Sequence, residues 1–177
     1  MNINPFDQPQ VQSSKDKTSE MLDYFTNHGK LPPTCSTLTL PEWIAQIKND
    51  SYIALLPFLQ LEDGDQELLF DLAFKIRKLT KRHVTLATGP SYLHSTGQMH
   101  KGGPVSGMYL QLFSDNVDEI PIADKKYGFS TLLAAQANGD MESLVSLNRP
   151  VCRVDLGTNI TKGLSNLIVQ FETLYEH

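Results

Sequence analysis

The sequence has few of the residues that cross-link small secreted proteins or anchor proteins in membranes. Only two cysteines, Cys35 and Cys152, occur among its 177 residues, and their spacing matches neither a metal-binding nor a redox motif. So few cysteines are typical of a reduced compartment. No apolar run approaches the roughly 20 residues that a membrane-spanning helix needs, and residues 1–10 have neither the basic nor the apolar region of a signal peptide. We therefore expect a soluble protein of the cytoplasm with no membrane partner.

Positive charge is also in deficit, since 15 Lys and Arg stand against 20 Asp and Glu, for a formal net charge of -5. Phosphate backbones need a basic surface, so we expect nucleic acid not to be a partner. The densest basic run, Lys75–His83, ends a helical pattern, where it complements the negative end of the helix dipole. A solvated helix end is a better interpretation of this run than a nucleic-acid site.

Hydrophobic residues make up 40% of the sequence, which is enough for one domain with a full core. Composition divides the chain into three parts. Residues 1–29 form an N-terminal arm with a helix, residues 30–50 form a proline-rich linker with a short helix, and residues 51–177 form a folded domain.

Apolar runs and amphipathic patterns alternate within the folded domain. Their order is β-α-β-β-α-β with a closing helix, the split βαβ order of ferredoxin-like α+β sandwiches. We predict this fold, with extra terminal helices and the N-terminal arm; the alternative is a small three-layer α/β sheet that carries one hairpin. The second long helix contains Asn138–Gly139, which we expect to interrupt it in a left-handed turn. The strands are expected at 52–59, 83–89, 106–114 and 150–157, and the helices at 63–81, 129–148 and 161–177.

Between the second and third expected strands lies YLHSTGQMHKGGP, the Tyr92–Pro104 segment, which holds two histidines, a lysine and three glycines. Two of its glycines have the spacing that opens a Walker A motif. Gly103-Pro104 stands where that motif needs Lys-Ser/Thr, however, and a strand is expected to follow, so the segment is no P-loop. His94 and His100 are six residues apart, which is no standard ligand spacing, and no cysteine or carboxylate lies near them in sequence. We therefore expect no metal site.

Two interpretations of the Tyr92–Pro104 segment stay open. In the first, it binds a sugar phosphate or another anion through imidazole, ammonium and backbone N–H groups. In the second, it is a tight connection between two strands, in which glycines supply turns with positive φ and polar side chains satisfy buried backbone groups. The residues that would contact the substrate in the first interpretation are His94, His100, Lys101, Gly102 and Gly103.

Several stretches resemble one enzyme family. INPFDQPQVQSSK, residues 3–15, resembles the C-terminal active-site segment of glucose-6-phosphate isomerases, in which a Pro/Phe-Asp-Gln turn leads into a helix that bears a lysine. Those positions are Gln8 and Lys15 here, while Gln10 replaces a glycine or an acid and Gln12 replaces a glutamate. The Tyr92–Pro104 segment, FSTLLAAQANGD and CRVDLG resemble the region that follows in bacterial bifunctional transaldolase/glucose-6-phosphate isomerases. Together the stretches cover the chain from residue 3 to about residue 157.

The resemblance implies an aldose–ketose isomerase that interconverts glucose 6-phosphate and fructose 6-phosphate without a cofactor. Such a reaction needs a general base, usually a carboxylate, to move a proton between adjacent carbons. The resemblance also implies that Lys15 stabilises developing negative charge on the sugar and that Gln8 helps to hold the substrate. The carboxylate, the ring-opening histidine and the phosphate cradle belong to an isomerase core that precedes these residues, so we expect the chain alone to be inactive.

The implied partners are a sugar phosphate and the upstream isomerase/transaldolase portion, in cis or in trans. Residues 1–29 would then correspond to the end of the isomerase core. An arm built for a larger active site has no core of its own, so we expect it to be mobile or displaced in the isolated chain. The alternative function is a non-catalytic docking module, or a sugar-phosphate-binding domain that uses residues 94–103.

Overall fold

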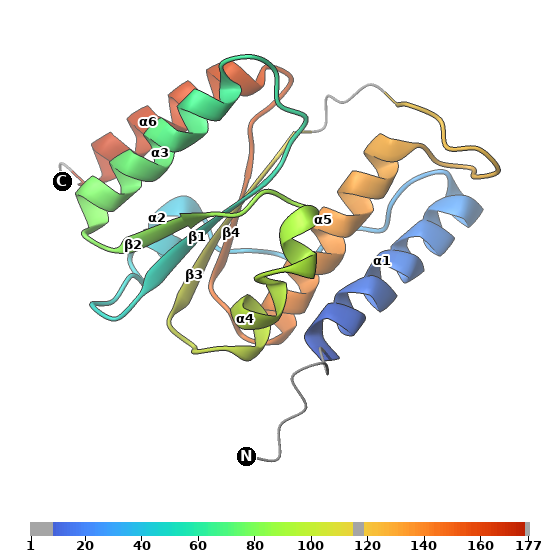
Figure 1. Cartoon of the computed structure of the whole chain (residues 1–177), viewed down its shortest axis with the longest axis horizontal. Coiled ribbons are helices and arrows are strands. Elements are labelled where there is room, and N and C mark those ends of the chain that lie inside the picture. Colours follow the sequence, from blue (N-terminus) through green and yellow to red (C-terminus); the bar gives the residue numbers. More distant parts are fainter. Residues whose placement is uncertain (1–8, 115–118, 176–177) are drawn as a thin grey trace.

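The structure is a computed structural model that describes residues 9–114 and 119–175. Four parallel strands form a sheet in the order β2-β1-β3-β4. Helices cover both faces, so the domain has three layers (Figure 1). The strands are β1 (Tyr52–Phe58), β2 (His83–Leu86), β3 (Gly107–Phe113) and β4 (Val151–Asp155).

One face of the sheet is covered by the long helices α3 (Asp65–Thr80) and α6 (Ile160–Tyr175), with the short α2 (Leu40–Ile44) beside them. The other face carries α5 (Phe129–Ser146) and the outer helix α1 (Pro9–His28) (Figure 1). The connection from β2 to β3 adds the 3-10 turn η1 (Ser91–His94) and the short α4 (Gly97–Gly102) on this second face. In the described part of the chain, no helix combines the length and the apolar character that a membrane span requires.

Alternate residues of the central strands serve two separate cores. On β1, Ile53 and Leu55 point into the core under α3 and α6, whereas Ala54 and Leu56 point into the core under α5. All four side chains are fully buried. A parallel sheet covered on both faces needs such near-continuous apolar strands, which explains why the β1 run has almost no polar residue.

The prediction of a mixed α and β domain is confirmed, in the form of the three-layer α/β alternative. A ferredoxin-like sandwich would pair its strands antiparallel and leave one face of the sheet without helices, whereas every pairing here is parallel. The expected hairpin is absent as well, because η1 and α4 lie between β2 and β3. This connection crosses over β1 and brings β3 back in the same direction as β2.

The expected break at Asn138–Gly139 is wrong, because α5 is continuous from Phe129 to Ser146. Gly139 serves the packing of α1 instead. A Cβ atom at Gly139 would lie 2.9 Å from Thr18 Oγ1 and 3.3 Å from the carbonyl oxygen of Ser14. The glycine therefore lets the two helices approach more closely than a larger residue would allow.

The described part of the N-terminal arm is neither displaced nor separate from the domain. Helix α1 lies along α5 (Figure 1), with Val11 and Met21 buried between the helices and the rest of the domain. Ser14 Oγ donates a hydrogen bond to Ser143 Oγ at 3.2 Å in this buried contact. The expectation of a loose arm fails because α1 has an apolar stripe that α5 covers.

Candidate functional site

The Tyr92–Pro104 segment is largely helical and not a plain loop between adjacent strands. Gly97, Gly102 and Gly103 all lack the positive φ that we expected of them. Other atoms lie close to the positions that their Cβ atoms would occupy. A Cβ atom at Gly103 would lie 2.3 Å from the carbonyl oxygen of Met99, and one at Gly102 would lie 2.7 Å from Gln98 Nε2. Close packing against backbone, rather than turn geometry, explains Gly103, whereas the flexible Gln98 side chain could move away from a Cβ atom at Gly102.

The predicted binding residues of this segment separate into a buried and an exposed set. His100 and Lys101 are only 1% and 2% exposed, whereas His94 and Gly102 are exposed and Gly103 is partly so. The two histidines that sequence analysis considered together therefore have different environments. In this conformation the side chains of His100 and Lys101 cannot reach a ligand in solvent.

Lys101 and Asp140 form an ion pair in the interior, with 2.5 Å between Nζ and Oδ1. The second carboxylate oxygen of Asp140 accepts a hydrogen bond from the Tyr92 hydroxyl. Burying a charge is costly unless an opposite charge and hydrogen bonds compensate for lost hydration. The pair therefore ties α4 to the middle of α5, and Tyr92 adds η1 to the same contact. With Tyr52, His100 and Tyr109, these residues make up what we call the buried polar cluster.

His100 belongs to a closed chain of hydrogen bonds with two tyrosines. The Tyr109 hydroxyl donates to the His100 carbonyl oxygen at 2.6 Å, so its oxygen is left to accept from the Tyr52 hydroxyl at 2.9 Å. Tyr52 in turn must accept from His100 Nδ1 at 3.1 Å. This order assigns the proton of a neutral His100 to Nδ1. Nε2 is left buried as a bare acceptor, with no hydrogen-bond partner among the described residues.

Burial sets the protonation of this cluster. Desolvation lowers the pKa of His100, and the nearby Lys101 ammonium lowers it further, against an opposing effect of Asp140. Desolvation raises the pKa of Tyr92 well above its usual value, and the charge of Asp140 adds to this rise. Burial also raises the pKa of Tyr109. At neutral pH the imidazole and both phenols are therefore uncharged, and the only charges are those of the ion pair.

Arg149 closes the C-terminal end of α4. Its Nη2 donates to the carbonyl oxygens of Lys101 at 2.8 Å and Gly103 at 2.7 Å, and its Nη1 donates to that of Pro104 at 2.7 Å. The last carbonyls of a helix lack partners within it, and a guanidinium satisfies several of them at once. A helix of six residues is thus held in place by side chains from α5 and the residues after it.

Of the residues that the resemblance implicates at the N-terminus, Gln8 lies outside the described residues. Lys15 is exposed on α1, one residue after the anchored Ser14. Gln10, near the start of the helix, accepts a hydrogen bond from Gln98 Nε2 on α4 at 2.5 Å. The structure therefore brings the N-terminal segment and the Tyr92–Pro104 segment into contact, although they are far apart in sequence.

Four residues of the site were not predicted from the sequence: Tyr52, Tyr109, Asp140 and Arg149. Asp140 offered a usable signal, because it lies beside Met141 and Ala137 on an otherwise apolar helix face, where an acid requires a buried cation. The tyrosines offered none, since each sits in a strand where an aromatic residue is ordinary. Across the described ranges, no group of three or more His, Cys, Asp or Glu side chains could hold a metal ion.

No family model and no curated protein sequence matches this chain. Among solved structures, it is similar to the hypothetical protein TT0462 from Thermus thermophilus, with a TM-score of 0.57 and 15% sequence identity. The match covers 96% of this chain and 44% of that one, so the chain spans less than half the length of that protein. At this identity the similarity supports the fold alone.

Proposed function

We propose that this chain is the C-terminal portion of a sugar-phosphate isomerase that interconverts glucose 6-phosphate and fructose 6-phosphate. In this proposal α1 presents Lys15 to an active site whose remaining groups come from an isomerase core, in cis or in trans. The proposal begins with the family resemblance of three stretches, residues 3–15, 92–104 and 129–140. The geometry adds that their described parts pack against one another.

The contact between these stretches is the observation that supports the proposal best. Gln98 of the second stretch bonds to Gln10 of the first, and Gly139 of the third leaves room for the backbone of Ser14. The packing of these stretches is what one expects if they maintain one shared surface around the start of α1.

Lys15 is suited to electrostatic work at that surface. It is exposed, and it has no ion-pair partner within the ranges that the structure describes. The helix beneath it is fixed by the Ser14–Ser143 hydrogen bond. An ammonium on a rigid element can stabilise the alkoxide that develops when the sugar ring opens, while a carboxylate of the core moves the proton between carbons. The lysine would neither donate nor abstract the transferred proton.

Within the Tyr92–Pro104 segment, we assign substrate contact to the exposed residues and structural support to the buried ones. His94 and Gly102 are exposed and offer groups that a sugar phosphate could contact, whereas His100 and Lys101 hold the segment against α5 through the buried polar cluster. A substitution of His94 should therefore weaken substrate binding with little effect on folding. A substitution of Lys101 should act through stability.

Complementation tests the proposal. A bacterial transaldolase/glucose-6-phosphate isomerase truncated before its equivalent of residue 3 is mixed with this chain, and fructose 6-phosphate formation is followed in a coupled assay. We expect neither part to be active alone and the mixture to be active. Lys15→Ala should reduce the kcat of the mixture at least about tenfold, the loss of roughly one charge-stabilising contact. Lys17→Ala, on the same helix, is the matched control and should keep the activity.

Other outcomes favour the alternatives. If the mixture forms a complex whose activity does not depend on Lys15, the chain is a docking module and not part of the active site. If glucose 6-phosphate at millimolar concentration perturbs the NMR signals of His94 in the chain alone, it is a sugar-phosphate-binding domain in its own right. Isomerase activity of the chain alone would show that the core is not needed.

A further inference from the structure

The solvent side of α3 carries a second stripe of residues, distinct from the one that packs on the sheet. Leu69, Leu72 and Ile76 face the core and are fully buried. On the opposite side, Phe70 and Phe74 are 55% and 67% exposed. These two phenylalanines are one turn apart and so lie next to each other on the helix surface. Two large aromatic side chains in such a position favour contact with another macromolecule.

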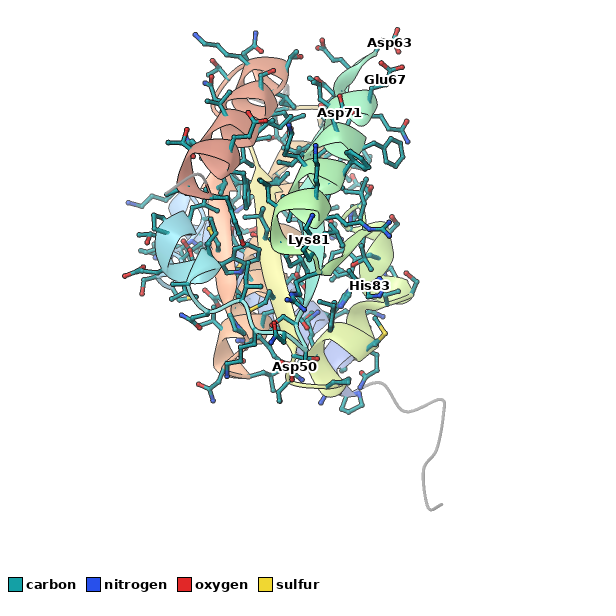
Figure 2. The ribbon with its side chains drawn as sticks, turned by 90° about the vertical axis from the view of Figure 1, so that its left-hand side faces the viewer. Asp50, Asp63, Glu67, Asp71, Lys81 and His83 are labelled. Carbon is teal, nitrogen blue, oxygen red and sulfur yellow. The ribbon has the colours of Figure 1, made fainter. Side chains whose placement is uncertain are left out.

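Charges of opposite sign flank the two phenylalanines along this stripe. Glu67 and Asp71 lie toward the N-terminal end, and Arg77 and Lys81 lie toward the C-terminal end. Figure 2 looks at this face and shows Glu67 and Asp71 toward one end of the helix and Lys81 at the other. The helical spacing of these four charged residues and Phe74 puts all five on one side of the helix. We call this set the α3 stripe: Glu67, Asp71, Phe74, Arg77 and Lys81.

The charges of the α3 stripe are not paired inside the chain. None of Glu67, Asp71, Arg77 and Lys81 makes an ion pair with another of the residues that the structure describes. Glu67 and Asp71 are one turn apart, as are Arg77 and Lys81, so within each pair the like charges repel. Lys75, one turn after Asp71, is paired with Glu172 on α6. The helix dipole favours acids in the first turn and bases in the last. It explains neither Asp71, which lies beyond the first turn, nor the exposed phenylalanines.

We propose that the α3 stripe binds the α3 stripe of a second copy of this chain, with the two helices antiparallel about a two-fold axis near Phe74. Glu67 lies seven residues before Phe74 and Lys81 seven after, and Asp71 and Arg77 lie three before and three after. An antiparallel arrangement therefore sets Glu67 against Lys81 of the second copy, Asp71 against its Arg77, and Phe74 against its Phe74. Such a self-complementary surface is what a two-fold dimer requires.

A hollow beside the stripe provides room for the aromatic contact. Phe74, Arg77 and Lys81 line it together with Lys78, Arg82 and His83, and its volume is about 560 Å³. The adjacent strand β2 is an edge of the sheet, so no other strand of the described residues pairs with its outer side. The charge pattern also favours a second copy of the chain over a nucleic acid as the partner of this surface. A nucleic acid would meet Glu67 and Asp71 beside the basic half, whereas a second copy satisfies both halves at once.

The contact of one helix with one helix is small. Interfaces below about 1,200 Å² of total buried surface are typically weak or transient. We therefore expect a dimer whose dissociation constant lies in the micromolar range or above, and whose stability falls with salt because its ion pairs are near the surface. This inference does not depend on the proposed function.

Sedimentation velocity of the whole chain over a range of concentrations tests the dimer. We expect the sedimentation coefficient to rise with concentration, and the dissociation constant to increase at least about tenfold when NaCl is raised from roughly 50 to 500 mM. Phe74→Ser should also weaken the dimer. A chain that stays monomeric at all concentrations up to about 1 mM would overturn the proposal.

Charge reversal identifies the surface. Glu67→Lys with Asp71→Lys makes an all-positive stripe, and Arg77→Glu with Lys81→Glu makes an all-negative one. Each variant should be monomeric alone, and the mixture should form a heterodimer at least as stable as the wild-type dimer. Recovery in the mixture excludes misfolding as the cause of the loss. Glu20→Lys and Lys162→Glu, on α1 and α6, are control reversals that should leave the dimer unchanged. A wild-type dimer that tolerates both stripe variants, or a mixture that stays monomeric, contradicts the proposal.

Discussion

Lys101 and Asp140 face each other across the interior at 2.5 Å and connect a helix of six residues to the middle of α5. Neither side chain has access to solvent. The pair gives Lys101 of the Tyr92–Pro104 segment a structural role. A lysine that would otherwise be available to an anion is committed to holding the fold together.

Removing one charge of this pair should be strongly destabilising. Lys101→Met leaves Asp140 buried, with Tyr92 as its one hydrogen-bond partner among the described residues, and we expect a loss of about 3–5 kcal/mol in the free energy of unfolding. The double variant Lys101→Met with Asp140→Leu removes both charges and should recover part of that loss. Urea unfolding followed by circular dichroism measures both. Equal losses in the single and double variants would mean that the unpaired charge of Asp140 is not what destabilises Lys101→Met.

His100 should make the stability depend on pH below neutrality. Burial lowers its pKa in the folded state below the 6.5 of a free histidine, so the unfolded state binds the proton first. Stability is therefore complete above about pH 6.5 and declines as the pH falls below it, by up to about 1.4 kcal/mol per pH unit. Urea unfolding between pH 8 and pH 5.5 should show this decline in the wild type.

Two variants assign that pH dependence. His100→Gln should flatten it, while His94→Gln, on the exposed residue of the same segment, should leave it as in the wild type. A decline of the same size in His100→Gln would place the responsible group elsewhere.

Gly139 should not tolerate a side chain. In Gly139→Ala the new methyl group would lie 2.9 Å from Thr18 Oγ1 and 3.1 Å from the Thr18 backbone nitrogen, so α1 must shift away from α5. Overpacking of this kind costs about 1–3 kcal/mol, which thermal denaturation would detect. Relative to the wild type, the variant should show faster hydrogen exchange in α1, with a smaller change in α6. Adding Thr18→Ala removes the nearest atom and should restore part of the stability; no restoration would implicate helix propensity or some other contact.

Cys152 should resist alkylation until the protein unfolds. It is 1% exposed in β4, and burial raises the pKa of its thiol to about 12, so almost no reactive thiolate exists at pH 8. Cys35 is partly exposed and, although burial also raises its pKa, iodoacetamide should label it first. Mass spectrometry of Cys35→Ser, in which Cys152 is the only thiol, checks this. Rapid labelling of that variant under native conditions would be inconsistent with the packing of β4.

The sequence allowed the strands and long helices to be predicted because each has a strong local pattern. The apolar run of Tyr52–Phe58 indicates a buried central strand, and the acids and bases of Asp65–Thr80 mark the two ends of a helix. Both patterns depend on neighbours in sequence. They hold wherever the element lies in the fold.

The direction of β3 could not be predicted in this way, because it depends on η1 and α4. Helices so short have little stability of their own. They exist because Arg149, Asp140 and Tyr109 hold them from elements distant in sequence. The same long-range contacts explain why the buried role of His100 and Lys101 was invisible in the Tyr92–Pro104 segment taken alone.

The hydrogen bond between Ser14 and Ser143 joins residues 129 positions apart in the chain. During synthesis, at about 5–20 residues per second, α1 leaves the ribosome roughly ten seconds before the helix that it packs against is complete. Throughout that interval the side of α1 that packs on α5 lacks the helix that covers it in the folded domain. The packing of α1 on α5 is therefore a late step in building this face of the domain, and chaperones that shield exposed apolar helices can act on α1 during that delay.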